Sequence, residues 1–398
     1  MPRNRKKPSA GDSQRRSQAA SPADCPSEDE AGEAVCEKEL HQAIENTSFR
    51  RQQTRVSAYR SVCEGLVQRY CPGSLAGRKM ALVESVKRSL RKGNEEERLW
   101  AVSVIPLLAL QSETCADVLE LVETFKPVMI GILTDVSLGN SNVRMKCCSV
   151  LGMLCFIGED ERADEIVSLM KILQETIKNE PVLVSGDIQA VELRSWTLLL
   201  TLLSPQKILE HAKSANLLSP RDLMAMLDSN HLEVRTASGE TLALMHELLC
   251  QHDSSFFQED LPDLLNTVRK LSTDAYHFQG KRGRKLQRIT FRDVLLYLQE
   301  GVVPEMRIKF GDETLLLNSW MMHRRYDCLK DVLGMALNVH LEENALVRDL
   351  LKLGPKVERI VRRPGGRIGK EFRHSFDASK ERSIARGKER DKRLFHLE

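Results

Sequence analysis

Two basic clusters near the C-terminal end hold the side chains of this sequence that are best suited to chemistry. The first lies within residues 277–292, which carry six basic and no acidic side chains, and the second lies within residues 380–393. Lysine and arginine bind phosphate groups and displace the counterions around a nucleic acid, so both clusters predict contact with a polyanion. The predicted RNA-binding residues are Lys281, Arg282, Arg284, Lys285, Arg288, Lys380, Arg382, Arg386, Lys388, Arg390, Lys392 and Arg393.

The two clusters differ in their expected local structure. Two glycines interrupt the first, HFQGKRGRKLQRITF, which predicts a mobile basic loop leading into an apolar helix. The alternative is a solvated loop whose charges only avoid one another. The second cluster could form a helix that is charged around most of its circumference. Such a helix has no apolar stripe to join a core, so we expect a free arm that becomes ordered on a partner, as arginine-rich segments do on RNA.

The sequence does not predict catalysis. RPGGRIGK at 363–370 resembles a phosphate-binding loop, but Pro364 occupies the first glycine position, and Glu371 follows the lysine where Ser or Thr is required. The histidines show no zinc-binding spacing, and His246 and His252 near Cys250 are expected to be solvent-facing or satisfied residues at a helix end. No nucleophile elbow is present either. We therefore expect a non-enzyme with no metal, no cofactor and no small-molecule substrate.

The sequence that precedes the basic clusters contains a helical repeat. Arginines recur at spacings of 43, 46, 50 and 41 residues, each inside an amphipathic pattern, which is the period of helical HEAT or armadillo repeats. An unrelated series of amphipathic helices that share an arginine by chance is the alternative. The repeat predicts equivalent helices, stacked in series, at Arg55, Arg98, Arg144, Arg194 and Arg235.

One unit shows the pattern most clearly. Between Thr134 and Gly158, after a start capped by Asn140 or Ser141, apolar residues follow the spacing of one helix face, which predicts a buried stripe of Val143, Cys147, Val150, Leu151 and Leu154. With only 5% aromatic residues, the chain also lacks the runs that β-sheets need. The expected fold is an all-α solenoid of armadillo or HEAT type, with a disordered N-terminal tail and a basic C-terminal arm.

Four regions follow from this reading. Residues 1–45 have the composition of a disordered tail, residues 46–275 hold the repeats, residues 276–355 continue the helical part with the basic loop, and residues 356–398 form the basic arm. The net charge of +3 hides a strong division, because residues 1–18, 277–292 and 352–398 carry +5, +6 and +8 while residues 19–45 carry −7. The body of the chain is therefore acidic, and polyanion binding is expected through the basic segments.

The cellular setting follows from the cysteines and the apolar runs. Ten cysteines include no CxxC pair, and no secretory signal precedes them, so buried thiols in a reducing compartment are expected. The longest apolar stretch, 101–110, is too short for a membrane span, so we expect a soluble protein with no membrane partner. The basic start PRNRKK could serve as a nuclear address or as a nucleic-acid contact.

Several stretches resemble the interferon-related developmental regulator family. They are RKLQRITFRDVLLYLQ, RIKFGDETLLLNSW, YDCLKDVLGMALNVHLEENALVRDLLKLGP and SKERSIARGKERDKR, while residues 356–375 depart from the family pattern. The resemblance implies an armadillo-like fold, no enzymatic activity and a role in gene expression during differentiation. It also implies two possible sets of partners: translationally inactive ribosomes, or transcription factors and histone deacetylase complexes in the nucleus.

The residues and the resemblance together give a leading hypothesis and an alternative. The leading one is a non-catalytic regulator that binds ribosomal RNA through its basic segments and represses translation. The alternative is a nuclear transcriptional co-regulator that scaffolds transcription factors and deacetylases. The expected location is accordingly both cytoplasmic and nuclear.

Overall fold

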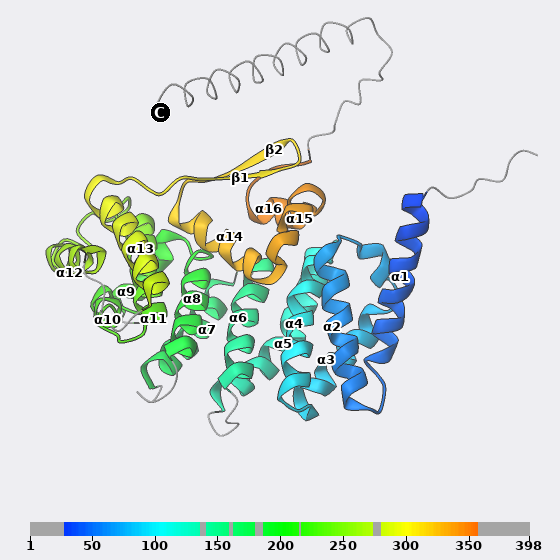
Figure 1. Cartoon of the computed structure of the whole chain (residues 1–398). Coiled ribbons are helices and arrows are strands. Elements are labelled where there is room, and N and C mark those ends of the chain that lie inside the picture. The colour runs from blue at the N-terminus through cyan, green and yellow to red at the C-terminus, as the bar shows by residue number, and fades with distance from the viewer. Residues whose placement is uncertain are drawn as a thin grey trace, which may run out of the picture. The chain divides into compact units, whose positions relative to one another are not determined.

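A computed structural model describes residues 28–135, 141–158, 162–179, 186–214, 216–273 and 280–356. Apart from one small hairpin, the regular elements described are helices, most of them in pairs that stack in a series (Figure 1). In each pair an outer helix packs on an inner helix, and the inner helices contact one another along the series. The outer helices are α1 (Glu28–Asn46), α3 (Lys79–Lys92), α5 (Cys115–Thr134), α7 (Ala163–Asn179), α10 (Pro220–Met226) and α12 (Leu261–Thr273), with α9 (Pro205–Lys213) preceding α10. The inner helices are α2 (Gln52–Gln68), α4 (Glu95–Leu110), α6 (Ser141–Gly158), α8 (Gly186–Leu200), α11 (Leu232–Leu249) and α13 (Lys281–Glu300).

The all-α solenoid predicted from the repeat is therefore confirmed. The predicted apolar stripe of α6 is buried, with Leu151 only 1% exposed, and it belongs to one continuous core that runs through all the pairs. Each pair alone would bury too little apolar surface to offset its conformational entropy, so the stacking supplies the stability. The described part of the chain has no helix that is long and apolar enough to cross a membrane.

Capping residues set the helix boundaries. Asn94 accepts a hydrogen bond from the backbone N–H of Glu97 at the start of α4, where three glutamates complement the helix dipole. The Ser204–Pro205 and Ser219–Pro220 pairs each place serine at the cap and proline at the first helical position.

The repeated arginine has a defined position and task. Arg55, Arg98, Arg144 and Arg235 are each the fourth residue of an inner helix. Each donates to a backbone carbonyl near the end of the preceding outer helix or in the turn after it, for example Arg144 Nε to the Leu133 oxygen at 3.0 Å. Such carbonyls have no partner inside their own helix, so a cation there satisfies them and complements the dipole.

Arg194 is not equivalent to the other four, which corrects the fourth repeat position. It is the ninth residue of α8, and the fourth is Gln189, whose amide donates to the carbonyl of Ile177 at the end of α7 at 3.3 Å. With Gln189 as the marker, the spacings become 43, 46, 45 and 46. The 50-residue spacing therefore came from choosing Arg194 instead of Gln189 as the marker of the fourth unit.

Two predicted regions are helical where loop or disorder was expected. Helix α1 begins at Glu28, within the predicted disordered tail, because Leu40, Ala43 and Ile44 form a buried stripe in the α1–α2 pair. The predicted basic loop is the first half of α13, whose Gln287, Phe291 and Val294 are buried at helical spacing. This helix is the inner member of a sixth pair, so the repeats continue beyond residue 275.

The chain then returns along the solenoid. Strands β1 (Met306–Phe310) and β2 (Glu313–Leu317) form an antiparallel hairpin, with Ile308 opposite Leu315 and Gly311 at a positive φ in the turn. This hairpin was not predicted. Helices α14 (Trp320–Leu333), α15 (Leu337–Glu343) and α16 (Ala345–Leu350) follow (Figure 1), and the side chain of Ser319 caps the start of α14.

We call α14–α16 the return segment, because it crosses the C-terminal ends of several inner helices. Arg325 donates to the carbonyl of Thr201 after α8 at 2.8 Å, His340 bonds the carbonyl of Val67 in α2 at 2.9 Å, and Asn344 donates to that of Leu110 in α4 at 2.7 Å. These are again carbonyls at helix ends. The return segment therefore binds three inner helices that lie 124, 273 and 234 residues away in the sequence.

Candidate nucleic-acid interface

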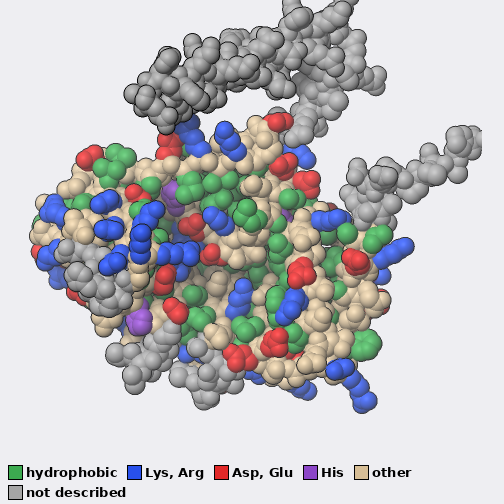
Figure 2. Space-filling view, in the orientation of Figure 1, with side chains coloured by type: hydrophobic (Ala, Val, Ile, Leu, Met, Phe, Trp, Pro, Cys, Tyr) green, Lys and Arg blue, Asp and Glu red, His purple; other side chains and the backbone are tan. Residues whose placement is uncertain are grey.

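The exposed side of α13 carries a stripe of cations. Lys281, Lys285, Arg288 and Arg292 follow one helix face at spacings of four, three and four residues, and all four side chains are exposed. Arg282 and Arg284 flank the stripe. We call these six residues the α13 basic face, and Figure 2 shows basic side chains gathered over this helix.

The buried side of α13 fixes this face in place. Arg235 of α11 donates to the side chain of Gln287 at 2.8 Å, and Gln287 donates to the carbonyl of Leu271 in α12 at 3.2 Å. Phe291 is fully buried against Gly239, where an added Cβ would lie 2.7 Å from the ring. Only glycine permits this close approach of the two helices.

The cations of the α13 basic face have no acidic partner among the described residues. None of the six forms an ion pair or a side-chain hydrogen bond there. Six like charges within about three helical turns repel one another, and an approaching polyanion relieves that repulsion. The structure thus gathers the first predicted cluster on one rigid face.

Exposed apolar side chains lie beside the cations on the same helix. Leu286, Ile289 and Leu296 are 45%, 46% and 40% exposed. Lone exposed apolar residues are common, but three on one helix next to a cationic stripe suit a partner that presents both charge and apolar surface. The second predicted cluster, Lys380, Arg382, Arg386, Lys388, Arg390, Lys392 and Arg393, lies outside the described residues, as does the 363–370 stretch.

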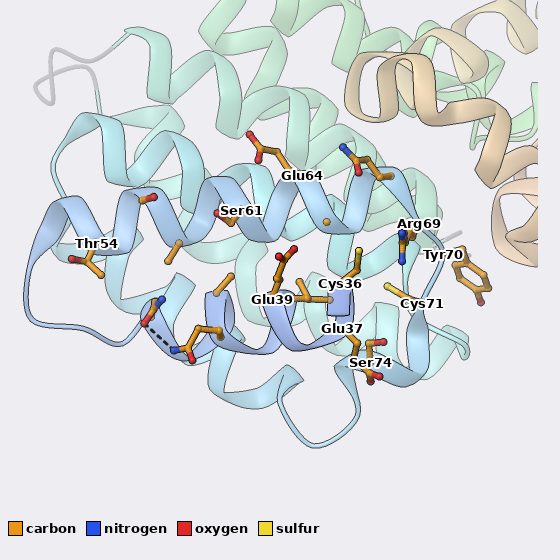
Figure 3. A pocket seen from close by; sticks show the side chains of 18 of the residues that line it. Cys36, Glu37, Glu39, Thr54, Ser61, Glu64, Arg69, Tyr70, Cys71 and Ser74 are labelled. Atoms are coloured by element: carbon orange, nitrogen blue, oxygen red, sulfur yellow. Dashed lines mark hydrogen bonds between the residues drawn. The ribbon is translucent and has the colours of Figure 1, made fainter. Parts of the chain in front are cut away.

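A wide groove of about 1550 Å³ runs between α1 and α2 at the first unit (Figure 3). Small side chains of α2, including Ser57, Ser61 and Gly65, form one wall, and Glu39 of α1 and Glu64 of α2 contribute acidic groups. Two thiols, Cys36 and Cys71, also line it. Burial raises the pKa of Cys71, which disfavours the reactive thiolate.

A smaller cavity of about 160 Å³ lies between α8, α11, α13 and α14. Its polar lining includes Glu240 of α11, Asp293 of α13 and Asp327 of α14. Sequence reasoning missed these residues, because they are isolated in the sequence and only the crossing of the return segment brings them together.

In the described part of the chain, no three His, Cys, Asp or Glu side chains are placed to hold a metal ion. Near the end of α11, His246 contacts the hydroxyl of Tyr297 through Nδ1 at 3.2 Å, and burial lowers its pKa. Cys147 and Cys148 are both fully buried, and burial raises the pKa of the Cys147 thiol to about 12.

Comparison with known proteins gives a consistent family. The model of the interferon-related developmental regulator family matches residues 9–299, and that of the interferon-related protein conserved region matches residues 344–394. The chain is 31% identical over 383 residues to interferon-related developmental regulator 2 of Mus musculus, covering 91% of this chain and 86% of the relative. It is 30% identical to interferon-related developmental regulator 1 of Sus scrofa, covering 92% of this chain and 83% of the relative.

Solved structures with a similar arrangement are distant. An engineered protein matches with a TM-score of 0.44 at 15% identity, covering 66% of this chain and 97% of its own. A designed armadillo repeat protein matches with a TM-score of 0.42 at 13% identity, covering 65% of this chain and 100% of its own.

Proposed function

Because this chain belongs to the interferon-related developmental regulator family, we propose that it is a non-catalytic regulator that binds translationally inactive ribosomes through ribosomal RNA. The family is one of developmental regulators rather than of known enzymes. In this proposal the α13 basic face and the 380–393 cluster contact phosphates, and occupancy of the ribosome represses translation.

The observation that carries the proposal is the α13 basic face itself. Five of its six cations are exposed and Arg284 is half-buried, none has an acidic partner among the described residues, and they stand on a helix fixed by buried contacts to α11 and α12. Because the helix that carries the cations is already folded, binding costs no backbone ordering at this site, which favours contact with a polyanion. The 380–393 cluster enters the proposal through its charge alone.

The neighbouring apolar residues favour a ribonucleoprotein over bare RNA. Leu286, Ile289 and Leu296 offer apolar surface beside the cations, and a ribosome exposes protein and RNA side by side. The acidic groove between α1 and α2 lies in the first unit and α13 in the last, so the groove remains available to a protein partner (Figures 1 and 3).

Sucrose-gradient fractionation of cells that express the tagged full chain tests the proposal. We expect co-migration with 80S monosomes, and we expect Lys285→Glu with Arg288→Glu to move the protein to the light fractions. The matched control reverses Lys92 and Lys171, two exposed lysines in α3 and α7, and should leave the gradient profile unchanged. Recovery of the wild type only in light fractions and nuclei would overturn the proposal and favour the co-regulator alternative.

A further inference from the structure

The turns that lead into α2 and α4 carry an exposed aromatic side chain beside a group of cations (Figures 1 and 2, lower right). Phe49 is 57% exposed, whereas every other Phe, Tyr and Trp side chain of the described residues is buried or half-buried. Four exposed cations come from the same turn and from the end of α3: Arg50, Arg51, Arg91 and Lys92. We call these five residues the N-terminal basic edge.

Polar contacts of Arg55 hold the turn that carries Phe49. Its guanidinium donates to the carbonyls of Phe49 and Arg50 at 3.0 and 2.7 Å, and to the two carboxylate oxygens of Glu97 at 2.8 Å each. Glu97 is only 2% exposed and stands in the first turn of α4, directly after the α3–α4 turn. The ion pair therefore joins the two turns of the edge, and the ring of Phe49 is exposed on a fixed part of the backbone.

The four cations of the N-terminal basic edge have no carboxylate partner among the described residues. The adjoining ion pair uses Arg55 and Glu97, and the side chain of Arg51 contacts an amide oxygen, that of Gln53, at 3.4 Å. Neighbouring like charges repel one another, and an aromatic ring exposed to water favours contact with another apolar group. A ligand that carries both carboxylates and an apolar side chain satisfies both requirements.

We propose that the N-terminal basic edge binds a short acidic segment of a partner protein, in which carboxylates flank an aromatic or large aliphatic side chain. Guanidinium groups bind carboxylates through paired hydrogen bonds, and the ring of Phe49 packs against the apolar side chain of the segment. Aromatic residues and arginine are the side chains enriched at the centres of protein–protein interfaces. Phenylalanine and three arginines make up most of this edge.

The acidic residues that border the edge favour a short peptide over a nucleic-acid strand. Glu45 lies in the last turn of α1, and Glu95 and Glu96 lie in the first turn of α4, and the side chains of Glu45 and Glu96 are exposed. A nucleic-acid strand carries a phosphate at every nucleotide, so a strand that crosses the edge also meets these carboxylates. A peptide places its acidic residues against the cations alone.

This interaction is separate from the proposed ribosome binding. The N-terminal basic edge belongs to the first two units of the solenoid, and the α13 basic face belongs to the last unit (Figure 1). Reversal of Arg50 and Arg91 leaves all six cations of the α13 basic face in place, so this variant should co-migrate with ribosomes like the wild type. Recognition of an acidic segment and ribosome binding can therefore fail independently.

Fluorescence anisotropy with the full chain at physiological ionic strength tests the proposal. The probe is a short labelled peptide with aspartates on both sides of a central phenylalanine. Comparison peptides replace the phenylalanine by alanine or the aspartates by asparagines, and a labelled single-stranded oligouridylate represents nucleic acid. We expect saturable binding of the acidic phenylalanine peptide, roughly threefold to tenfold weaker binding of the alanine peptide, and no saturable binding of the asparagine peptide.

Two variants locate the binding site. Phe49→Ala should bind the phenylalanine and alanine peptides equally, and Arg50→Glu with Arg91→Glu should bind the acidic phenylalanine peptide roughly tenfold or more weakly than the wild type. The charge-matched control is Lys285→Glu with Arg288→Glu on α13, which should bind this peptide like the wild type. All five exchanged side chains are exposed, so the variants should fold, and circular dichroism checks this.

The oligouridylate distinguishes the two classes of partner. The edge variants should bind it like the wild type, because its contacts lie on the α13 basic face in the proposed function. An equal loss of oligouridylate and peptide binding in the edge variants would overturn the proposal and assign the edge to nucleic acid. No saturable peptide binding, equal binding of the phenylalanine and alanine peptides by the wild type, an equal loss of peptide binding in the α13 control, or a loss of ribosome co-migration in the Arg50 and Arg91 variant would each overturn it as well.

Discussion

At the scale of single residues, the repeated arginines are explained by the hydrogen bond that the fourth residue of an inner helix donates. Arginine occupies it in α2, α4, α6 and α11, and Gln189 occupies it in α8, because either side chain can donate to the carbonyls at the preceding helix end. A search for arginine alone finds the first three units and the fifth, but places the fourth at Arg194. The fourth position requires a side chain that is long enough to donate a hydrogen bond to the carbonyls at the end of the preceding outer helix. The spacing of arginines alone does not reveal that glutamine also meets this requirement.

Substitutions of Arg235 and Arg194 should therefore lower the free energy of unfolding by different amounts. Arg235 is fully buried, and Arg235→Met leaves the carbonyl of Ser229 and the side chain of Gln287 without this donor. We expect the free energy of unfolding to fall by about 1–3 kcal/mol for each buried group left unsatisfied. Urea unfolding followed by circular dichroism measures it.

The control for that change is Arg194→Met. Arg194 pairs with Glu233 in a partly exposed ion pair, whose removal should cost less than about 1 kcal/mol. Equal losses in the two variants would show that the fourth position has no special role.

At the scale of elements, the first five inner helices and the start of α14 could be predicted, whereas helix α13 and the contacts of the return segment could not. The buried stripe of α6 and the cap of α14 follow from local spacing and residue type. Helix α13 was mistaken for a loop because Gly283 and six cations conceal the buried spacing of Gln287, Phe291 and Val294. The contacts of His340 and Asn344 with α2 and α4 span more than 200 residues, and no local pattern encodes them.

The return segment should make stability depend on pH through His340. Its Nε2 must carry the proton, because its partner is the Val67 carbonyl at 2.9 Å, and Nδ1 then faces the amide of Asn344 at 3.4 Å as an acceptor. Burial lowers the pKa of His340. A second proton would turn Nδ1 into a donor facing another donor.

The sign of the effect follows from proton binding. The unfolded chain takes up this proton more readily than the folded chain, so stability is complete above the ordinary histidine pKa of about 6.5 and is lost as the pH falls through the lowered pKa of the folded state. One group contributes a slope of at most about 1.4 kcal/mol per pH unit.

His340→Gln keeps a donor and an acceptor at this position but does not titrate. We expect the variant to lose less stability than the wild type when the pH is lowered from about 7 to about 5.5, measured by urea unfolding at each pH. Parallel curves for the two proteins would contradict the role of His340.

At the scale of the whole molecule, charge is divided between an acidic body and basic segments. Only part of this charge distribution could be assigned to a binding site from the sequence. The sequence located the cations of 277–292, and the structure arranges them as the α13 basic face at the last repeat. The 160 Å³ cavity escaped prediction, because its charged lining exists only once the return segment lies against α8, α11 and α13.

The most direct test of the central claim is pelleting of the purified full chain with ribosomes through a sucrose cushion at several salt concentrations. Each phosphate contact that is lost should reduce the slope of log affinity against log salt by about 0.7–0.9, so Lys285→Glu with Arg288→Glu should lower it by roughly 1.4–1.8. Reversal of Arg386, Lys388, Arg390 and Lys392 should lower it further, and reversal of Lys92 and Lys171 should not change it. Equal pelleting and equal slopes for the wild type and the α13 variant would contradict the account.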